Sequence, residues 1–452
     1  MRLLHNLLHR LKLMTRRSAS PSLPPPAKRV KLDTQHAPLT PEDFKNGLVL
    51  APMVRSGALP TRLFALKHGA SLVWGPEIVD KAILHAERVV DPKTGLVSYN
   101  GKSRAIFTTH PIEKPYLIYQ IGSSDPSLAV QAAKIVMQDV SGIDLNCGCP
   151  KPFSTHAGMG AALLTNPDML CNILVALREA MPPHITVSAK IRLLPSQEDT
   201  LKLVERIVNT GVSCLTVHCR TRSMRENDPA VISRLREIVE FVEGMGRGIA
   251  VIENGDCLGA SDVQRVRDAT GAHSVMIARA AEANPSAFSL IPLTDVHQTL
   301  VPAYLRLAKY LDNHWSLTKF CASQFKGTFT TSNKNEEKRI REAVVRARSF
   351  EDVASIVGEW TGEEEFKEIA KVIEARPIRM RKEGIADIIN KEADEDSTTT
   401  LTPPNTTNPE PPSSRAPHMG KDGPRFLPAA VTGQDPLTPT PGSIPATPTP
   451  LA

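Results

Sequence analysis

The stretch 185–220, ITVSAKIRLLPSQEDTLKLVERIVNTGVSCLTVHCR, decides the fold class because its hydrophobic pattern changes period twice. Its two ends, ITVSAKI (185–191) and CLTVHCR (214–220), are short apolar runs rich in β-branched residues, a pattern typical of buried strands. Between them, QEDTLKLVERIVNT (197–210) has apolar residues at helical spacing and acids in its first turn. The stretch therefore predicts strand, helix, strand, the unit that places two parallel strands in one sheet.

The same unit repeats over most of the chain. Eight apolar runs occur, most of them separated by helical segments: GLVLAPM (47–53), SLVWGPEI (71–78), YLIYQIG (116–122), GIDLNCG (142–148), ITVSAKI (185–191), CLTVHCR (214–220), IAVIENG (249–255) and SVMIARA (274–280). The interval between the second and third runs is longer and is expected to be partly loop. Eight parallel strands predict a closed (β/α)8 TIM barrel of the α/β class. The alternative is an open doubly wound sheet, but no Gly-x-Gly-x-x-Gly loop follows any run.

Composition indicates a globular protein with a buried core and no membrane-spanning segment. The 452 residues, 41% of them hydrophobic, allow a sizeable core. No apolar run approaches the roughly 20 residues that span a bilayer, so we expect no membrane partner. The seven cysteines are odd in number and scattered, which favours free thiols in a reducing compartment. Residues 1–37 hold eight Lys/Arg against one Asp, so the net charge of +6 resides in this segment and says little about nucleic acid.

The two ends of the chain differ from its middle. MRLLHNLLHRLKLMTRRSAS (1–20) has no acid and is similar to a mitochondrial transit peptide, whereas PPPAKRVKLD (24–33) resembles a nuclear import signal. We therefore expect a cytoplasmic or nuclear location, with a mitochondrial one as the alternative. The Pro/Thr/Ser-rich end predicts a disordered tail. The expected organisation is a basic disordered or targeting segment (1–40), the barrel (41–295), a small helical domain (296–390) and the tail (391–452).

Candidate site residues stand at or just beyond the ends of seven of the eight apolar runs, and at six of these runs they include polar side chains. In a parallel barrel the carboxyl ends of the strands share one mouth, so these side chains are expected to meet there. Each alone is readily explained as solvated or salt-bridged, but their shared position predicts an active site. In strand order they are Pro52 and Met53, Gln120, Asn146 and Cys149, Lys190 and Arg192, His218 and Arg220, Asn254, Gly255 and Asp256, and Ala278 and Arg279.

The residue types at this mouth suit a flat heterocycle that carries one phosphate. The Asn254–Gly255 turn and Arg279 come after the last two strands, where barrels bind phosphate. Amide and ammonium groups on the third, fourth and fifth strands can hydrogen-bond the edge of a ring, with Met53 against its face. Flavin mononucleotide (FMN) has both parts. Nothing in the sequence suggests a site for an adenine dinucleotide.

The stretch GIDLNCGCPKP (142–152) contains a pair of cysteines one residue apart. This spacing is wrong for half of a structural zinc site, and no second Cys or His pair completes one, so we expect no metal. A disulfide across one residue would be strained. These exclusions leave two free thiols, and the spacing alone does not say which of them does chemistry.

A set of motifs in fixed order carries a family resemblance. They are APMVR (51–55), YQIG (119–122), DLNCGCPK (144–151), GMGAALL (158–164), AKIR (189–192), HCRTR (218–222) and ENGD (253–256). Together they resemble those of the tRNA-dihydrouridine synthases over residues 47–350, and in particular the eukaryotic branch that acts on D-loop uridine 20. We expect a member of fungal type, without the double-stranded-RNA-binding domain of animal relatives. It also has Ala278-Arg279 where many relatives have Gly-Arg.

The resemblance implies an oxidoreductase that reduces the C5=C6 bond of a uridine in tRNA with FMN and NADPH. Hydride adds to C6 and a proton reaches C5 from Cys149. A thiol suits this role because it is protonated at neutral pH yet is a far stronger acid than water. The resemblance assigns flavin contacts to Pro52, Met53, Val54, Gln120, Asn146, Lys190, His218, Asn254, Gly255, Asp256, Ala278 and Arg279.

A tRNA substrate needs a surface beyond the barrel. Residues 300–350 hold ten Lys/Arg against four Asp/Glu on segments with helical apolar faces. Expected tRNA contacts are Arg192 and Arg220 at the mouth and Lys338, Arg339 and Arg341 in the helical segment.

We expect a monomer. Two alternatives are an FMN barrel oxidoreductase for a small pyrimidine-like molecule and a non-catalytic tRNA-binding chaperone.

Overall fold

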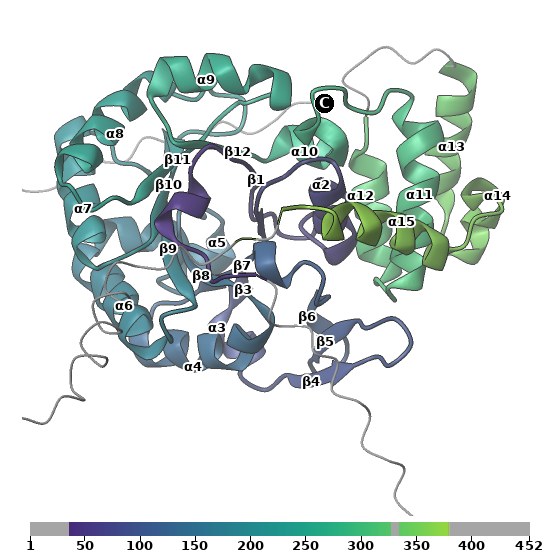
Figure 1. Cartoon of the computed structure of the whole chain (residues 1–452), viewed down its shortest axis with the longest axis horizontal. Helices are drawn as coiled ribbons and strands as arrows, with labels where there is room; N and C mark the ends of the chain where they lie inside the picture. Colours follow the sequence, from purple (N-terminus) through teal and green to yellow (C-terminus); the bar gives the residue numbers. More distant parts are fainter. Residues whose placement is uncertain (1–35, 327–333, 378, 380–452) are drawn as a thin grey trace, which may run out of the picture. The chain divides into compact units, whose positions relative to one another are not determined.

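The computed structural model describes residues 36–326, 334–377 and 379 (Figure 1). The predicted targeting segment and the Pro/Thr-rich tail lie outside these residues. None of the described helices is long and apolar enough to cross a membrane.

Eight parallel strands close into a barrel, as the sequence predicts (Figure 1). The ring closes because β2 pairs with β1 on one side and with β7 on the other. Every strand overlaps one of the predicted apolar runs. They are β1 (Leu48–Leu50), β2 (Val73–Trp74), β7 (Leu117–Gly122), β8 (Gly142–Cys147), β9 (Thr186–Leu193), β10 (Cys214–Thr221), β11 (Ala250–Asn254) and β12 (Ser274–Ile277).

Helices cover the outside of the barrel (Figure 1). Several begin where a polar side chain caps the first turn: Asp125 accepts from the Leu128 N–H at 2.9 Å, and Ser196 accepts from the Asp199 N–H at 3.0 Å. The helices between or just after strands are α2 (Leu59–Lys67), α3 (Asp80–Ile83), α4 (Pro126–Val136), α5 (Pro152–Thr155), α6 (Pro167–Ala180), α7 (Gln197–Asn209), α8 (Leu235–Gly244), α9 (Val263–Thr270) and α10 (Arg279–Ala283).

The interval between the second and third barrel strands is more ordered than predicted. After β2, the short strand β3 (Ile78–Val79) pairs with β7, and an antiparallel sheet follows. Its strands are β4 (Glu87–Val90), β5 (Val97–Asn100) and β6 (Ala105–Thr109). All four residues of β4 are exposed, so this strand lacks the apolar signal that marks the barrel strands.

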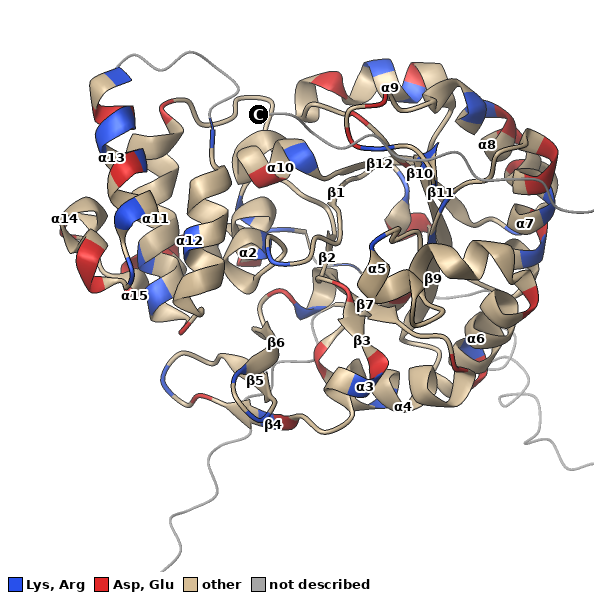
Figure 2. Cartoon of the chain, turned by 180° about the vertical axis from the view of Figure 1, so that it is seen from behind, with Lys and Arg blue, Asp and Glu red and all other residues tan. Residues whose placement is uncertain are grey.

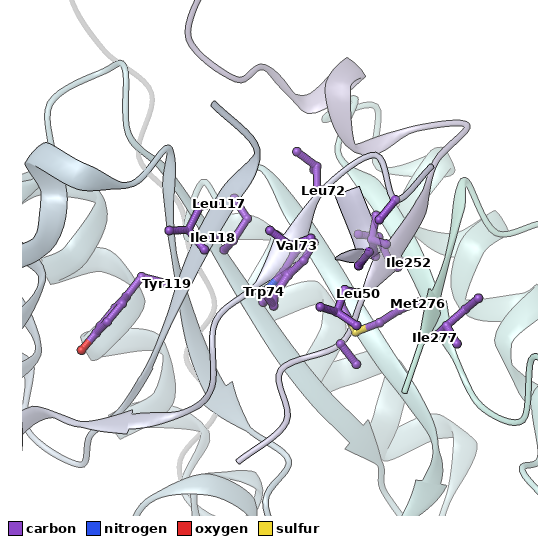
Figure 3. Packing of buried hydrophobic residues seen from close by; sticks show 14 of the residues in the cluster. Leu50, Leu72, Val73, Trp74, Leu117, Ile118, Tyr119, Ile252, Met276 and Ile277 are labelled. Carbon is purple, nitrogen blue, oxygen red and sulfur yellow. The ribbon is translucent and has the colours of Figure 1, made fainter. Parts of the chain in front are cut away.

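Apolar side chains fill the barrel interior where its first and last strands meet. Leu50, Trp74, Ile252 and Met276 come from four different strands, and each is at most 1% exposed. Figure 3 shows Leu50, Trp74 and Met276 packed close together. Full burial of such side chains contributes about 1.5–3 kcal/mol each. This packing closes the interior, so chemistry is confined to the mouth.

A helical part follows the barrel and packs on α2. Its helices are α11 (Val296–Tyr310), α12 (Trp315–Gln324), α13 (Lys334–Arg346), α14 (Ala354–Val357) and α15 (Gly362–Glu374). The Tyr304 hydroxyl lies 3.2 Å from the Thr61 hydroxyl of α2, and the Lys67 ammonium lies 3.5 Å from Glu365 of α15. Both contacts fix the helical part to α2, the helix that follows the first barrel strand.

Candidate active site

The predicted residues of the later strands meet in one hollow at the barrel mouth. It has a volume of about 880 Å³. Its lining includes most of the candidates after the fifth to eighth runs: Arg192, His218, Arg220, Asn254, Gly255, Asp256, Ala278 and Arg279. The four adjacent strands β9 to β12 deliver these side chains because their carboxyl ends lie next to one another.

A buried carboxylate organises the polar groups beneath this mouth. Asp144 on β8 is fully buried and accepts hydrogen bonds from the Gln120 amide at 2.8 Å and the Ser188 hydroxyl at 2.6 Å. Lys190 on β9 pairs in register with Asn146, two residues further along the sheet, and interacts electrostatically with Asp144. Burial, followed by the nearby charge of Arg192, lowers the pKa of Lys190 to about 8. Gln120 is therefore held in place by Asp144. Lys190 loses its proton at a lower pH than an ordinary lysine does.

His218 on β10 is a neutral hydrogen-bonding group. Burial, and then the positive charges of Lys190 and Arg192, hold its pKa well below the usual range. The Arg220 guanidinium lies 3.2 Å from His218 Nε2. Because a guanidinium only donates, Nε2 must accept, and the ring hydrogen is on Nδ1. His218 thus offers one N–H to a bound molecule.

Asp256 ties together the two arginines that flank the end of β11. Its carboxylate accepts from Arg220 at 2.6 and 2.7 Å, from Arg279, and from the Ala230 N–H at 2.8 Å. Burial opposes ionisation, but the hydrogen bonds from Arg220 and Ala230 hold the pKa of Asp256 below its usual value. Arg220 is buried in this pair, whereas half of the Arg279 side chain is exposed. Arg279 is thus the better placed of the two to meet an anion.

The loop that carries Cys149 is fixed by side chains of β8 and of the neighbouring strand β9. The Asn146 side-chain oxygen accepts from the N–H groups of Gly148 at 2.9 Å and Cys149 at 3.0 Å. Arg192 Nε donates to the Gly148 carbonyl at 2.8 Å. Gly160 has φ 58°, and a Cβ there would lie 2.6 Å from the Cys149 carbonyl, so only glycine fits. The backbone of Cys149 is therefore held rigidly at the mouth.

The two cysteines of the GIDLNCGCPKP stretch occupy different environments. Cys147 is fully buried on β8, whereas Cys149 is partly exposed at the mouth. Burial and then the charge of Glu77 raise the pKa of the Cys149 thiol. Of the two, only Cys149 is accessible to a bound molecule.

The comparison with known families decides where the chain belongs. A family model described as Dihydrouridine synthase (Dus) matches residues 49–373. The chain belongs to the dihydrouridine synthase family.

Two yeasts contain similar dihydrouridine synthases. The chain is 46% identical over 320 residues to the tRNA-dihydrouridine(20) synthase (NAD(P)+) of Schizosaccharomyces pombe, a match that covers 69% of this chain and 64% of that protein. It is 42% identical over 307 residues to the protein of the same name from Saccharomyces cerevisiae, which covers 62% of this chain and 77% of that protein. The match to the S. pombe relative thus spans just under two thirds of its length.

Glu77 lies beside this site and was missed by the sequence interpretation. It lies between β2 and β3, is 8% exposed and faces the Cys149 loop, where the Ser154 hydroxyl is 3.3 Å from its Oε1. One signal was available. The second apolar run was the only one of the eight without a candidate, although WGPEIVD (74–80) contains two acids.

The remaining candidates are not among the residues that line this hollow. Pro52, Met53 and Val54 follow β1, and Val54 is 51% exposed. Lys338, Arg339 and Arg341 lie on α13, at the outer edge of the helical part (Figure 2). Arg339 pairs with Glu336 at 2.5 Å. The roles of these side chains in flavin and tRNA binding stay predictions.

Proposed function

We propose that the chain is a flavin-dependent tRNA-dihydrouridine synthase that reduces the C5=C6 bond of uridine 20 in the D loop, with NADPH as the reductant. Membership of the family and the names of the two yeast relatives support this function. The observation that carries it is a partly exposed thiol, Cys149, held rigidly beside a mouth lined with cations and N–H donors.

The donor set fits FMN. Arg279, with an exposed guanidinium after β12, and the Asn254–Gly255 turn are suited to a phosphate. Lys190 and His218 offer a cation and an N–H to the edge of a ring. Bound there and reduced by NADPH, the flavin would supply a hydride to C6 of the uracil. The protein must then bind, orient and protonate the base.

Cys149 supplies the proton to C5 in this proposal. Because burial and Glu77 raise its pKa, the thiol keeps its proton at neutral pH. Negative charge on the uracil O4 needs a nearby donor, and Lys190, Arg192 and His218 are the candidates. Arg192 has fewer free N–H groups, because it donates to the carbonyls of Gly148 at 2.8 Å and Thr221 at 3.0 Å. The three together make the mouth favourable to an anion.

The tRNA body would be held by the helical part, whose α13 carries exposed Lys338 and Arg341. The target base must leave its loop to reach the mouth. We place the protein in the cytoplasm or nucleus as a monomer, with domain limits as the sequence predicts.

One assay separates this function from its alternatives. Purified protein is incubated with NADPH and either unmodified tRNA or free uridine, and dihydrouridine is measured and located by mass spectrometry. We expect product at position 20 of tRNA and none from free uridine. Product from uridine alone would favour a small-molecule oxidoreductase. Tight tRNA binding without product would favour a chaperone.

A further inference from the structure

The Glu77 carboxyl is buried among polar groups of the Cys149 loop. The Ser154 hydroxyl lies 3.3 Å from Glu77 Oε1, and the side chains of Asn146 and Cys149 are close enough to affect the pKa of Glu77. Gly122 on β7 leaves the room it needs, because a Cβ there would lie 2.5 Å from Glu77 Oε1. Three elements of the barrel thus converge on one side chain next to the thiol.

This burial is not explained by stability. In the part of the chain that the structure describes, no Lys or Arg pairs with Glu77, and its Oε2 has no hydrogen-bond partner. A buried carboxyl without a cation costs free energy, even when some of its hydrogen bonds are made. Burial accordingly raises the pKa of Glu77. The arrangement is unfavourable by itself and therefore points to a role in the site.

The charges around Cys149 oppose one another. Lys190 and Arg192 on β9 interact with the thiol from one side, and their positive charges favour the thiolate. Glu77 faces the thiol from the other side, where its charge and its hydrogen bond raise the pKa of Cys149. A thiol that must donate a proton to carbon has to stay protonated, so the effect of Glu77 on its pKa must exceed that of the two cations.

We propose that Glu77 is a positioning residue that keeps Cys149 protonated and aimed at the mouth, offsetting the two cations of β9. This inference rests on the proposed role of Cys149 as proton donor. In that step the S–H bond of Cys149 breaks and a C5–H bond forms. The thiolate that remains lies beside the Glu77 carboxyl, and this unfavourable contact promotes its reprotonation by water.

The alkylation of Cys149 tests this inference without tRNA or NADPH. Iodoacetamide reacts with the thiolate, so its rate against pH, followed at the Cys149 peptide by mass spectrometry, reports the midpoint of thiol ionisation. We expect Glu77→Gln to move this midpoint down by about one pH unit, which is about tenfold faster alkylation at pH values below the midpoint. An unchanged or higher midpoint would overturn the proposal.

Glu253→Gln is the matched control. Like Glu77, Glu253 on β11 is a buried carboxyl with an unpartnered oxygen; both of its oxygens lack a hydrogen-bond partner among the described residues, and it interacts with Cys219 instead of Cys149. We expect it to leave the Cys149 midpoint unchanged, and an equal shift would show that any loss of buried charge has this effect, which rejects the proposal.

Glu77→Asp decides the matter if Glu77→Gln does not fold. It keeps the charge but withdraws it by one methylene, so we expect a smaller shift in the same direction, and no shift would again reject the role. The alkylation assay does not depend on dihydrouridine formation. If the wild type forms no dihydrouridine, the proposed function fails, but the effect of Glu77 on the ionisation of Cys149 is still measured.

Discussion

At the scale of single residues, the site works by setting charges against one another in a partly buried space. Asp144 compensates Lys190 beneath the mouth, Asp256 binds Arg220 and Arg279 at its edge, and Glu77 opposes Lys190 and Arg192 at the thiol. None of these pairings is visible in the sequence, because each depends on which strands are neighbours and on their register. The cations and Asp256 were predicted as polar side chains at strand ends, whereas Asp144 and Glu77 were not among the sequence candidates.

Lys190 gives a prediction for the pH dependence of stability. Its pKa is about 8 in the folded protein and 10.5 ordinarily, so between these values the unfolded chain binds more protons, and the free energy of unfolding rises with pH. The rise amounts to about 3 kcal/mol at most. Urea unfolding of wild type and Lys190→Met from pH 7 to 10.5 measures it as the difference between the two proteins. A difference that stays constant over this range would show that Lys190 has an ordinary pKa.

At the scale of elements, apolar periodicity was enough to predict the barrel. Each of its eight strands is buried on both faces, so each leaves a continuous apolar run in the sequence. The sheet of β4 to β6 left no such run, because β4 is exposed and pairs on one side only. Glu77 was missed for a related reason: the chain after β2 does not pass directly into a helix but turns to pair β3 with β7.

At the scale of the whole molecule, the helical part extends the described chain beyond the barrel and carries basic residues away from the mouth (Figure 2). Its position is fixed by specific contacts to α2, such as Thr61 with Tyr304. A tRNA that reaches both the mouth and α13 would be held at two places. In the proposed function, α13 is thus a positioning surface for the tRNA body, separate from the chemistry.

The variant Lys338→Glu with Arg341→Glu tests this surface. We expect tRNA binding to weaken by about tenfold or more at low salt, and the slope of log affinity against log salt to fall by about one for each phosphate that the variant no longer neutralises. Binding is measured by filter retention at several salt concentrations. The control, Lys134→Glu with Lys202→Glu, reverses two exposed charges on barrel helices α4 and α7. Equal weakening in both variants would mean that the effect comes from net charge alone.

The most direct test of the central claim compares the two cysteines of GIDLNCGCPKP. Dihydrouridine formed on unmodified tRNA with NADPH is measured over time for wild type, Cys149→Ala and Cys147→Ser. We predict that Cys149→Ala keeps flavin and tRNA binding but slows product formation by about 10²–10⁴-fold, the contribution of a positioned general acid, while Cys147→Ser stays close to wild type. Wild-type rates in Cys149→Ala, or the large loss in Cys147→Ser instead, would contradict the account.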